Sequence, residues 1–284
     1  MRRPLVGALA TLLLTGAGTA TAVAAPSAPA PAPAPAKSTA KAVDFAGTVA
    51  LSNCSGSLIR LPSSADNDPA LVLTNGHCLE TGMPGPGDVV VDQPSSRTFS
   101  LLNSTAGKAG TLRASKVAYA TMTDTDVTLY QLNSTYAQIK KNYRIDALNL
   151  SADRPAAGTA IKVVSGYWKK IYSCNVDGFV HELHEGDWVW KDSLRYTPSC
   201  NTIGGTSGSP VVDVNTGKVV AVNNTGNENG ERCTENNPCE VDENGNVTVR
   251  KGINYAEQTY GIAKCITKGN RVDLSLDGCA LPKP

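Results

Sequence analysis

Short apolar runs separated by turn residues recur along the chain from about residue 43 onward. Clear examples are A-L-V-L-T at 70–74, V-T-L-Y-Q-L at 127–132 and K-V-V-A-V at 218–222. Runs of this kind, roughly ten residues apart, are typical of β-strands in a sandwich or barrel. Only Tyr136–Tyr143 and Ala256–Ile266 suit short helices. We therefore predict an all-β fold.

The N-terminus has the pattern of a segment that directs export. Arg2 and Arg3 precede the apolar stretch 5–17, and the small residues Ala22-Val23-Ala24 follow it. This order is typical of a secretory signal peptide, and the apolar stretch is too short to span a bilayer. We predict a signal peptide at 1–24 and a secreted, extracellular protein that has no membrane association after cleavage; an uncleaved membrane anchor is the alternative.

A proline-rich stretch follows the predicted signal peptide. Proline occupies nearly every second position from Pro26 to Pro35. Such a run is extended and does not pack a core. Residues 25–42 are therefore expected to be a linker or a short pro-segment, and residues 43–284 the folded domain.

All eight cysteines lie beyond the predicted signal peptide: Cys54, Cys78, Cys174, Cys200, Cys233, Cys239, Cys265 and Cys279. An even number in an exported chain predicts disulfides. Zinc sites favour close pairs such as C-x-x-C, which do not occur, so no metal is expected. A Cys54–Cys78 bridge would close a loop of about 25 residues and contribute roughly 3–4 kcal/mol.

The charged residues nearly balance. The chain has 26 Lys and Arg against 25 Asp and Glu, a net charge of +1. This balance gives no electrostatic reason to expect nucleic acid or an anionic membrane as a partner. The acidic turn 242–246 lacks the glycine of a calcium-binding loop at the required position, so a plain hairpin is expected there.

Three histidines occur in the chain, and the surroundings of one of them suit a catalytic base. His77 lies at the end of the apolar strand in L-V-L-T-N-G-H-C, residues 71–78, and is followed directly by Cys78. His181 and His184 lie in H-E-L-H, which is not the H-E-x-x-H pattern of zinc peptidases. We interpret these two as surface residues and His77 as a candidate base.

An acid and a nucleophile follow His77 in the chain. Asp126 enters the apolar run 127–129, where a carboxylate can be buried beside a histidine, and Asp124 in the preceding turn is the alternative. Ser207 lies in G-G-T-S-G-S-P at 204–210, which is also ordinary turn material. Base, acid and serine together are the requirements of a serine hydrolase.

Four motifs, C-S-G-S-L-I, T-N-G-H-C, D-V-T-L and G-T-S-G-S-P, occur in this order over residues 54–210. The chain thereby resembles the chymotrypsin-like serine peptidases, and its pattern is nearest to bacterial glutamyl-endopeptidase-like members. The resemblance implies two six-stranded antiparallel β-barrels, at about 43–150 and about 151–263. A short C-terminal helix and a tail held by a disulfide would follow.

The resemblance also implies roles for individual residues. Ser207 would be the nucleophile, His77 the base and Asp126 the acid that orients it. The backbone N–H groups of Gly205 and Ser207 would form the oxyanion hole. Substrate-binding residues would be Asn201, Thr202, Asn223, Asn224, Thr225 and Gly226. No cofactor is expected.

Three positions depart from the pattern of known relatives. Thr206 stands where many members have an aspartate that pairs with a new N-terminus, so we expect no need for such a pair. Asn201 gives no counter-charge for Arg or Lys. Asn223 replaces the histidine of the glutamyl-specific relatives, although Thr202 matches them. The prediction is a polar, neutral pocket.

For the remaining cysteines we favour local pairings, Cys174–Cys200, Cys233–Cys239 and Cys265–Cys279. The resemblance keeps Cys200–Cys233 open as an alternative.

The sequence thus predicts a secreted, monomeric serine endopeptidase whose partners are protein or peptide substrates. A catalytically inactive relative that binds a partner, and an esterase-like hydrolase, are the alternatives.

Overall fold

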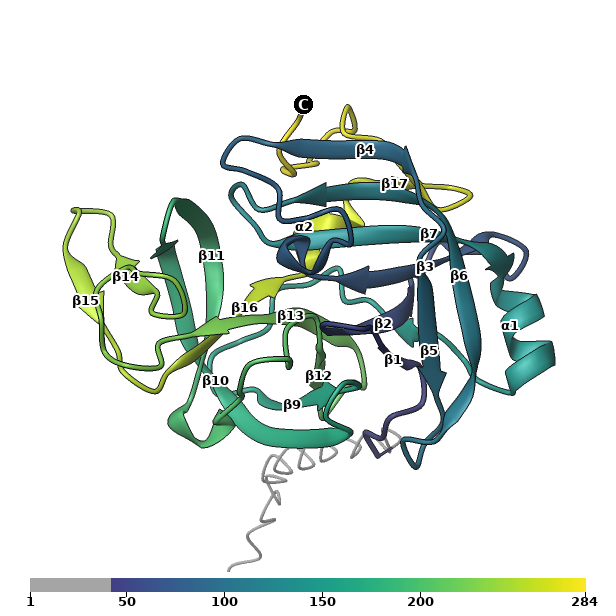
Figure 1. Cartoon of the computed structure of the whole chain (residues 1–284), viewed down its shortest axis with the longest axis horizontal. Coiled ribbons are helices and arrows are strands. Elements are labelled where there is room, and N and C mark those ends of the chain that lie inside the picture. Colours follow the sequence, from purple (N-terminus) through teal and green to yellow (C-terminus); the bar gives the residue numbers. More distant parts are fainter. Residues whose placement is uncertain (1–41) are drawn as a thin grey trace, which may run out of the picture. The chain divides into compact units, whose positions relative to one another are not determined.

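The computed structural model describes residues 42–284, so the predicted signal peptide and nearly all of the linker lie outside the described residues. The first sheet closes into a six-stranded antiparallel barrel in the order β1-β5-β6-β7-β3-β2, with β1 also paired to β2 (Figure 1). Its strands are β1 (Thr48–Ala50), β2 (Ser55–Arg60), β3 (Pro69–Thr74), β5 (Thr98–Leu102), β6 (Lys108–Thr121) and β7 (Val127–Thr135). Beside this ring, β4 (Val89–Pro94) pairs with β6 and β8 (Leu148–Asn149) runs parallel to β2.

The second sheet also closes on six antiparallel strands, in the order β11-β16-β13-β12-β9-β10, with β10 paired to β11. These strands are β9 (Ala160–Ser165), β10 (Lys170–Glu185), β11 (Trp188–Tyr196), β12 (Pro210–Asp213), β13 (Val219–Gly226) and β16 (Asn254–Gln258). The hairpin of β14 (Cys239–Val241) and β15 (Val247–Val249) extends from β10. The predicted all-β fold with two six-stranded barrels is confirmed, whereas the exact domain boundaries stay predictions.

One of the two predicted helices forms as expected. Helix α1 (Tyr136–Tyr143) begins with a capping box between Thr135 and Gln138, which satisfies its first free N–H groups. The prediction for 256–266 is partly wrong, because residues 254–258 are strand β16 and only α2 (Tyr260–Ala263) is helical. Pairing with β13 and β11 inside the closed barrel overrides the local preference for helix.

Short elements complete the chain. They are the 3₁₀ turns η1 (Gly76–Cys78) and η2 (Pro198–Cys200), and a tail hairpin of β17 (Ile266–Thr267) and β18 (Arg271–Val272). The Cys265–Cys279 disulfide ties this tail together.

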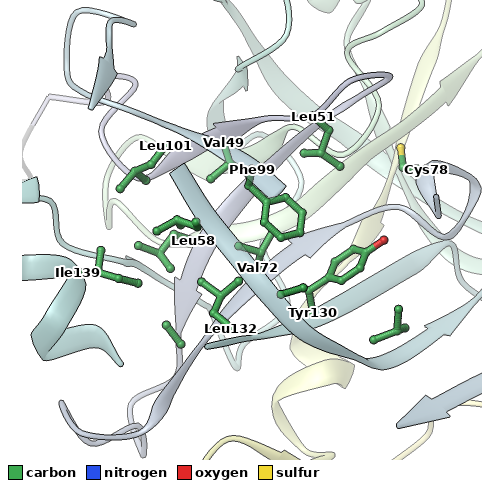
Figure 2. Packing of buried hydrophobic residues seen from close by; sticks show 14 of the residues in the cluster. Val49, Leu51, Leu58, Val72, Cys78, Phe99, Leu101, Tyr130, Leu132 and Ile139 are labelled. Atoms are coloured by element: carbon green, nitrogen blue, oxygen red, sulfur yellow. The ribbon is translucent and has the colours of Figure 1, made fainter. Parts of the chain in front are cut away.

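Each barrel is filled by the inward-facing residues of its strands. Val49, Leu58, Val72, Phe99 and Tyr130 belong to the core of the first barrel (Figure 2). The second barrel has its own cluster, which includes Ile161, Val163, Leu194, Val211 and Val220. A further cluster joins side chains of both barrels and of the tail, among them Leu71, Leu73, Val164, Val212 and Leu281. This shared core fixes the junction at which the candidate site lies.

All four favoured disulfides are present: Cys54–Cys78, Cys174–Cys200, Cys233–Cys239 and Cys265–Cys279. The Cys200–Cys233 alternative is therefore wrong. Cys54–Cys78 lies beside His77, and Cys174–Cys200 anchors the chain shortly before Ser207.

Candidate active site

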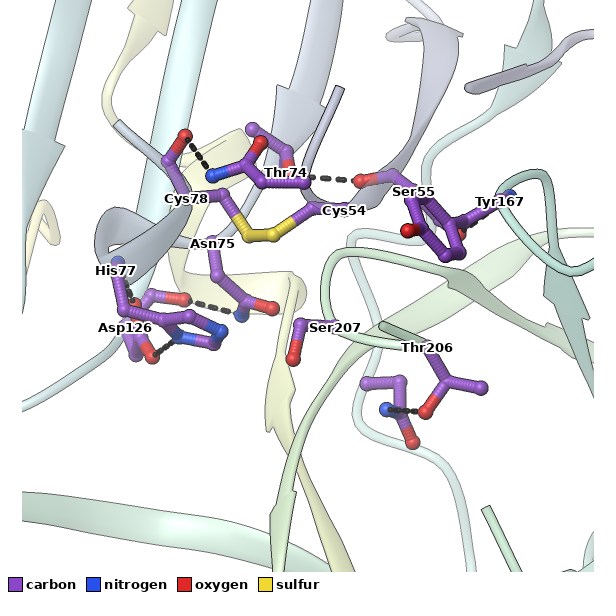
Figure 3. The surroundings of a disulfide bond; sticks show 12 residues. Cys54, Ser55, Thr74, Asn75, His77, Cys78, Asp126, Tyr167, Thr206 and Ser207 are labelled. Carbon is purple, nitrogen blue, oxygen red and sulfur yellow. Dashed lines mark hydrogen bonds and ion pairs between the residues drawn. A yellow bond between two sulfur atoms is a disulfide. The ribbon is translucent and has the colours of Figure 1, made fainter. Parts of the chain in front are cut away.

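His77 and Asp126 form a close, directed pair at the junction of the barrels. Asp126 Oδ2 lies 2.6 Å from His77 Nδ1, and Asp126 Oδ1 accepts the backbone N–H of His77 at 3.0 Å (Figure 3). Asp126 is fully buried, whereas the histidine side chain keeps 21% of its surface exposed. The carboxylate thus holds both the ring and the backbone of the histidine, and leaves Nε2 available for other contacts.

The residues around His77 explain why the chain folds this way. Asn75 Nδ2 donates to the backbone carbonyl of Asp126 at 2.8 Å, which joins the end of β3 to the start of β7. A Cβ at Gly76 would lie 2.1 Å from the Thr121 carbonyl oxygen, so only glycine fits there. The Asn75 hydrogen bond and the steric requirement for glycine at position 76 therefore together bring the histidine onto the aspartate.

The alternative acid lies elsewhere. Asp124 Oδ1 is 2.9 Å from Lys191 Nζ, and both side chains are substantially exposed. The structure therefore brings Asp126, and not Asp124, to His77.

The charges around His77 favour its protonated form. Burial lowers the pKa of His77, but the charge and the hydrogen bond of Asp126, together with the charge of Glu185, raise it above 6.5 overall. A base of this kind is neutral only above that raised pKa.

Ser207 is held by its backbone against the first barrel. Its carbonyl accepts the backbone N–H of Ser55 in β2 at 2.8 Å, and its hydroxyl donates to the carbonyl of Asn224 at 3.2 Å. Gly208 has φ +78°, and a Cβ there would lie 2.0 Å from the Ser55 carbonyl oxygen. The glycine after Ser207 is thus required for the close approach of the two barrels. In this structure the single proton of the Ser207 hydroxyl is directed to Asn224 and not to His77.

The peptide between Gly204 and Gly205 is oriented by Trp168. The indole Nε1 donates to the Gly204 carbonyl at 2.8 Å, and Gly205 has φ +84°. Because the C=O and N–H of one trans peptide point in opposite directions, the Gly205 N–H points away from Trp168. The predicted oxyanion donor thus has a defined direction.

A polar network holds the loop at Thr206, where the charged pair of many relatives is missing. The Thr206 hydroxyl donates to the Ile203 carbonyl and accepts from Asn223 Nδ2 at 3.2 Å. Asn223 Oδ1 in turn accepts the Tyr196 hydroxyl at 3.2 Å. Thr206 and Asn223 are both buried. Neutral hydrogen bonds therefore connect the loop to the barrel interior, which supports our expectation that no N-terminal ion pair is needed.

A cavity of about 420 Å³ opens beside His77 and Ser207. All six predicted substrate-binding residues line it: Asn201, Thr202, Asn223, Asn224, Thr225 and Gly226. Asp126 and Gly205 do not line it, since Asp126 lies behind the histidine and Gly205 packs against Tyr167 and Trp168. Asn223 has both ends of its amide engaged inside the protein, so its side chain serves the loop and does not face a ligand.

Sequence reasoning missed three residues near this cavity. Asn254 Oδ1 accepts the backbone N–H of Thr202 at 3.2 Å and supports that wall. Glu185 lines the cavity with 7% of its surface exposed, and burial raises its pKa. Glu257 lies beneath Asn224, and burial raises its pKa to about 8. Strand alternation offered one signal, because Glu185 shares a strand face with buried Leu183.

The other two histidines take no part in this site. His184 Nε2 lies 2.9 Å from Glu182 Oε2 on β10, and neither His181 nor His184 lines the cavity. Cys54, His77 and Cys78 lie close together, but both sulfur atoms are engaged in their mutual disulfide. That cluster therefore offers no thiolate ligand to a metal.

Within residues 42–284, no helix has the length and apolar character needed to cross a bilayer.

Comparison with known proteins identifies one family and several similar folds. Residues 54–222 match the family model of the trypsin-like peptidase domain. A comparison with curated protein sequences gave no match. The active form of the Rv3671c protease from M. tuberculosis is 16% identical, with a TM-score of 0.49, over 93% of this chain and 97% of that chain. The MamO protease domain from Magnetospirillum magneticum is 13% identical, with a TM-score of 0.48, over 78% and 97%. A Glu endopeptidase in complex with MPD is 16% identical, with a TM-score of 0.42, over 75% and 85%.

Proposed function

The chain belongs to the trypsin-like peptidase family, and from this membership we propose that it is a secreted serine endopeptidase acting through Ser207, His77 and Asp126. The observation that carries the proposal is the buried Asp126 carboxylate at 2.6 Å from His77, on a cavity that Ser207 also lines. A histidine fixed in this way has one nitrogen committed to the acid and the other free to take a proton.

The proposed reaction begins when Ser207 Oγ attacks the carbonyl carbon of the substrate bond. The hydroxyl proton passes to His77 Nε2, and the new oxyanion is met by the N–H groups of Gly205 and Ser207. His77 then gives the proton to the leaving nitrogen as the C–N bond breaks. Water attacks the resulting ester by the same route and restores Ser207. Asp126 stabilises the cationic imidazole in both halves.

The orientation of the Ser207 hydroxyl is the observation that favours a second candidate. Its bond to the Asn224 carbonyl must be exchanged for one to His77 before attack, by rotation about the Cα–Cβ bond. Hydrogen bonds in a substrate-free site often tighten only when substrate binds. A chain in which this rotation does not occur would be the catalytically inactive, partner-binding relative.

Secretion is supported by two independent features. Four disulfides are typical of proteins that fold under oxidising conditions. The N-terminal pattern of two arginines, an apolar stretch and small residues has the order of a signal peptide. Protein or peptide substrates follow from the family, and a monomer remains our expectation.

The pocket chemistry favours a neutral substrate residue at the cleaved bond. Asn201 supplies an amide and no countercharge, whereas the side chains of Asn254 and Asn223 are already bonded within the protein. A glutamyl preference therefore has no dedicated partner at that position.

A fluorophosphonate probe tests the proposal because it reacts only with an activated serine. We expect labelling of the wild-type protein and none of Ser207→Ala. Absence of labelling in correctly folded wild type would favour the inactive, partner-binding candidate. Matched peptide and ester substrates then separate the endopeptidase from the esterase-like alternative.

A further inference from the structure

Glu185 lines the cavity but makes and breaks no bond in the proposed reaction. It is the last residue of β10, and its cross-strand partner is Trp188 on β11. Trp188 Nε1 donates to the Pro84 carbonyl, and Trp190 Nε1 donates to the Met122 carbonyl, each at 3.0 Å. Both tryptophans line the cavity together with Met83 and Met122. Glu185 thus lies beside an aromatic and apolar wall.

The Glu185 carboxyl is only partly satisfied within the protein. Oε1 accepts the backbone N–H of Asn236 at 2.8 Å, and the Thr225 side chain offers a further hydrogen bond. Oε2 is buried without a partner that meets hydrogen-bond geometry. A buried carboxylate oxygen without a donor is costly, so a donor that enters the cavity and reaches this carboxyl would lower that cost.

The surroundings specify the charge of that partner. Among the described residues that line the cavity there is no lysine or arginine, and His77 is the one side chain that can become a cation; Glu228 and Glu235 lie at the exposed rim. The Cys233–Cys239 disulfide closes the short loop that carries Asn236, which keeps the carboxyl in place. A fixed carboxylate with an acidic rim and two indole rings attracts a cation that has an apolar stem.

We propose that Glu185 binds the side chain of a lysine or arginine in the substrate, at a position N-terminal to the cleaved bond. This inference rests on the proposed peptidase function. The ammonium or guanidinium group supplies the donor that Oε2 lacks once rotation of the Glu185 side chain exposes this oxygen, and the methylene stem lies against Trp188.

The strand β13 indicates which side of the cleaved bond is involved. Asn224, whose carbonyl meets the Ser207 hydroxyl, is followed directly by Thr225, which contacts Glu185. The pairing of β13 with β16 is irregular between Asn223 and Gly226. A substrate held on Ser207 through its acyl half can extend along this edge as an added strand. At about 3.3 Å per residue, its next few residues pass Glu185.

The test uses peptidyl-aminocoumarin substrates, which carry residues only on the acyl side of the cleaved bond. Each of the three positions preceding the residue at the cleaved bond is varied among Lys, Arg, norleucine, Gln and Glu. For wild type we expect Lys or Arg to exceed norleucine in kcat/KM by about tenfold to a hundredfold at one position, the range of a charge-assisted hydrogen bond. Glu should be the poorest residue there.

Variants assign the preference to Glu185. Glu185→Gln should bring the Lys-to-norleucine ratio close to one, whereas Glu243→Gln should leave it unchanged. Glu243 is an exposed control of the same charge that does not line the cavity. Each ratio compares two substrates on one variant, so a general change in activity cancels. A flat wild-type profile, or a ratio that survives Glu185→Gln, overturns the inference.

Fluorophosphonate labelling keeps this result separate from the proposed function. Labelling without a cationic preference refutes only the role of Glu185. If the wild type is not labelled, the affinities of Ser207→Ala for Lys-containing and norleucine-containing peptides still decide the inference by calorimetry. Equal affinities would overturn it, and about tenfold tighter binding of the Lys peptide would support it.

Discussion

Replacing Glu257 by glutamine tests the electrostatics beneath the cavity. Glu257 is 1% exposed on β16, and its Oε1 accepts Ser193 Oγ at 3.0 Å and Asn224 Nδ2 at 3.1 Å. Burial is the main cause that raises its pKa from 4.5 to about 8, and the charge of Asp126 raises it further against the hydrogen bonds that lower it. The folded protein therefore keeps this carboxyl protonated at neutral pH, whereas the unfolded chain does not.

The magnitude follows from the difference between the two pKa values. Between pH 4.5 and about 8 the folded state binds the extra proton, so the free energy of unfolding falls as the pH rises. The slope reaches about 1.4 kcal/mol per pH unit, and the whole effect is on the order of 4–5 kcal/mol. Glutamine has nearly the same shape and does not titrate.

The assay is urea unfolding at a series of pH values from 4 to 9, on a Ser207→Ala background that prevents self-digestion. We expect the stability of Glu257→Gln relative to its parent to rise across this range and to level off above about pH 8. A constant offset between the two proteins reflects only the new side chain. A difference that does not change between pH 5 and 8 would refute the reasoning.

Three further outcomes follow from the site. Asp126→Asn should slow fluorophosphonate labelling by about 10⁴-fold, the scale known for a related triad. Asp124→Asn should leave the labelling rate nearly unchanged. The reverse pattern would mean that the acid is misassigned. Thr206→Val should lower the free energy of unfolding by about 1–3 kcal/mol, because it leaves the buried amide of its partner unsatisfied, and urea unfolding that matches wild type would contradict this. The labelling rate should fall at low pH with a midpoint above 6.5, because His77 must be neutral to accept a proton. This midpoint should move to lower pH in Glu185→Gln. A midpoint that does not move would show that this carboxylate does not act on the histidine.

The sequence predicted those features that depend on local pattern. Strand runs and turns were enough for the all-β fold, and Thr135 with Gln138 begins the helix where it was expected. The order of His77, Asp126 and Ser207 predicted a site whose first two members the structure brings into contact. Short spacing also favoured the correct disulfide between Cys233 and Cys239.

The remaining features depend on contacts between distant segments. Ala256 is suited to a helix by local preference, but it pairs with Asn223 and Leu194 once the barrel closes. In the sequence, Glu185 is one of three acidic residues in the stretch 181–187. Its importance arises only where Asn236 and Thr225 meet it from other strands and loops. The periodicity of apolar residues in the sequence does not predict contacts of this kind between distant segments.

The disulfide beside His77 also sets a distance. Cys78 follows His77 directly, Cys54 precedes Ser55 directly, and the Ser55 N–H holds the Ser207 carbonyl at 2.8 Å. His77 and Ser207 come from different barrels, and this path of one sulfur–sulfur bond and one hydrogen bond connects them. The pairing of β2 with β3, and the Thr74 hydroxyl that donates to the Ser55 carbonyl at 2.7 Å, hold the same two segments together without the disulfide. Oxidation of the two thiols therefore adds a covalent restraint to these contacts and limits how far the His77 segment can separate from Ser55.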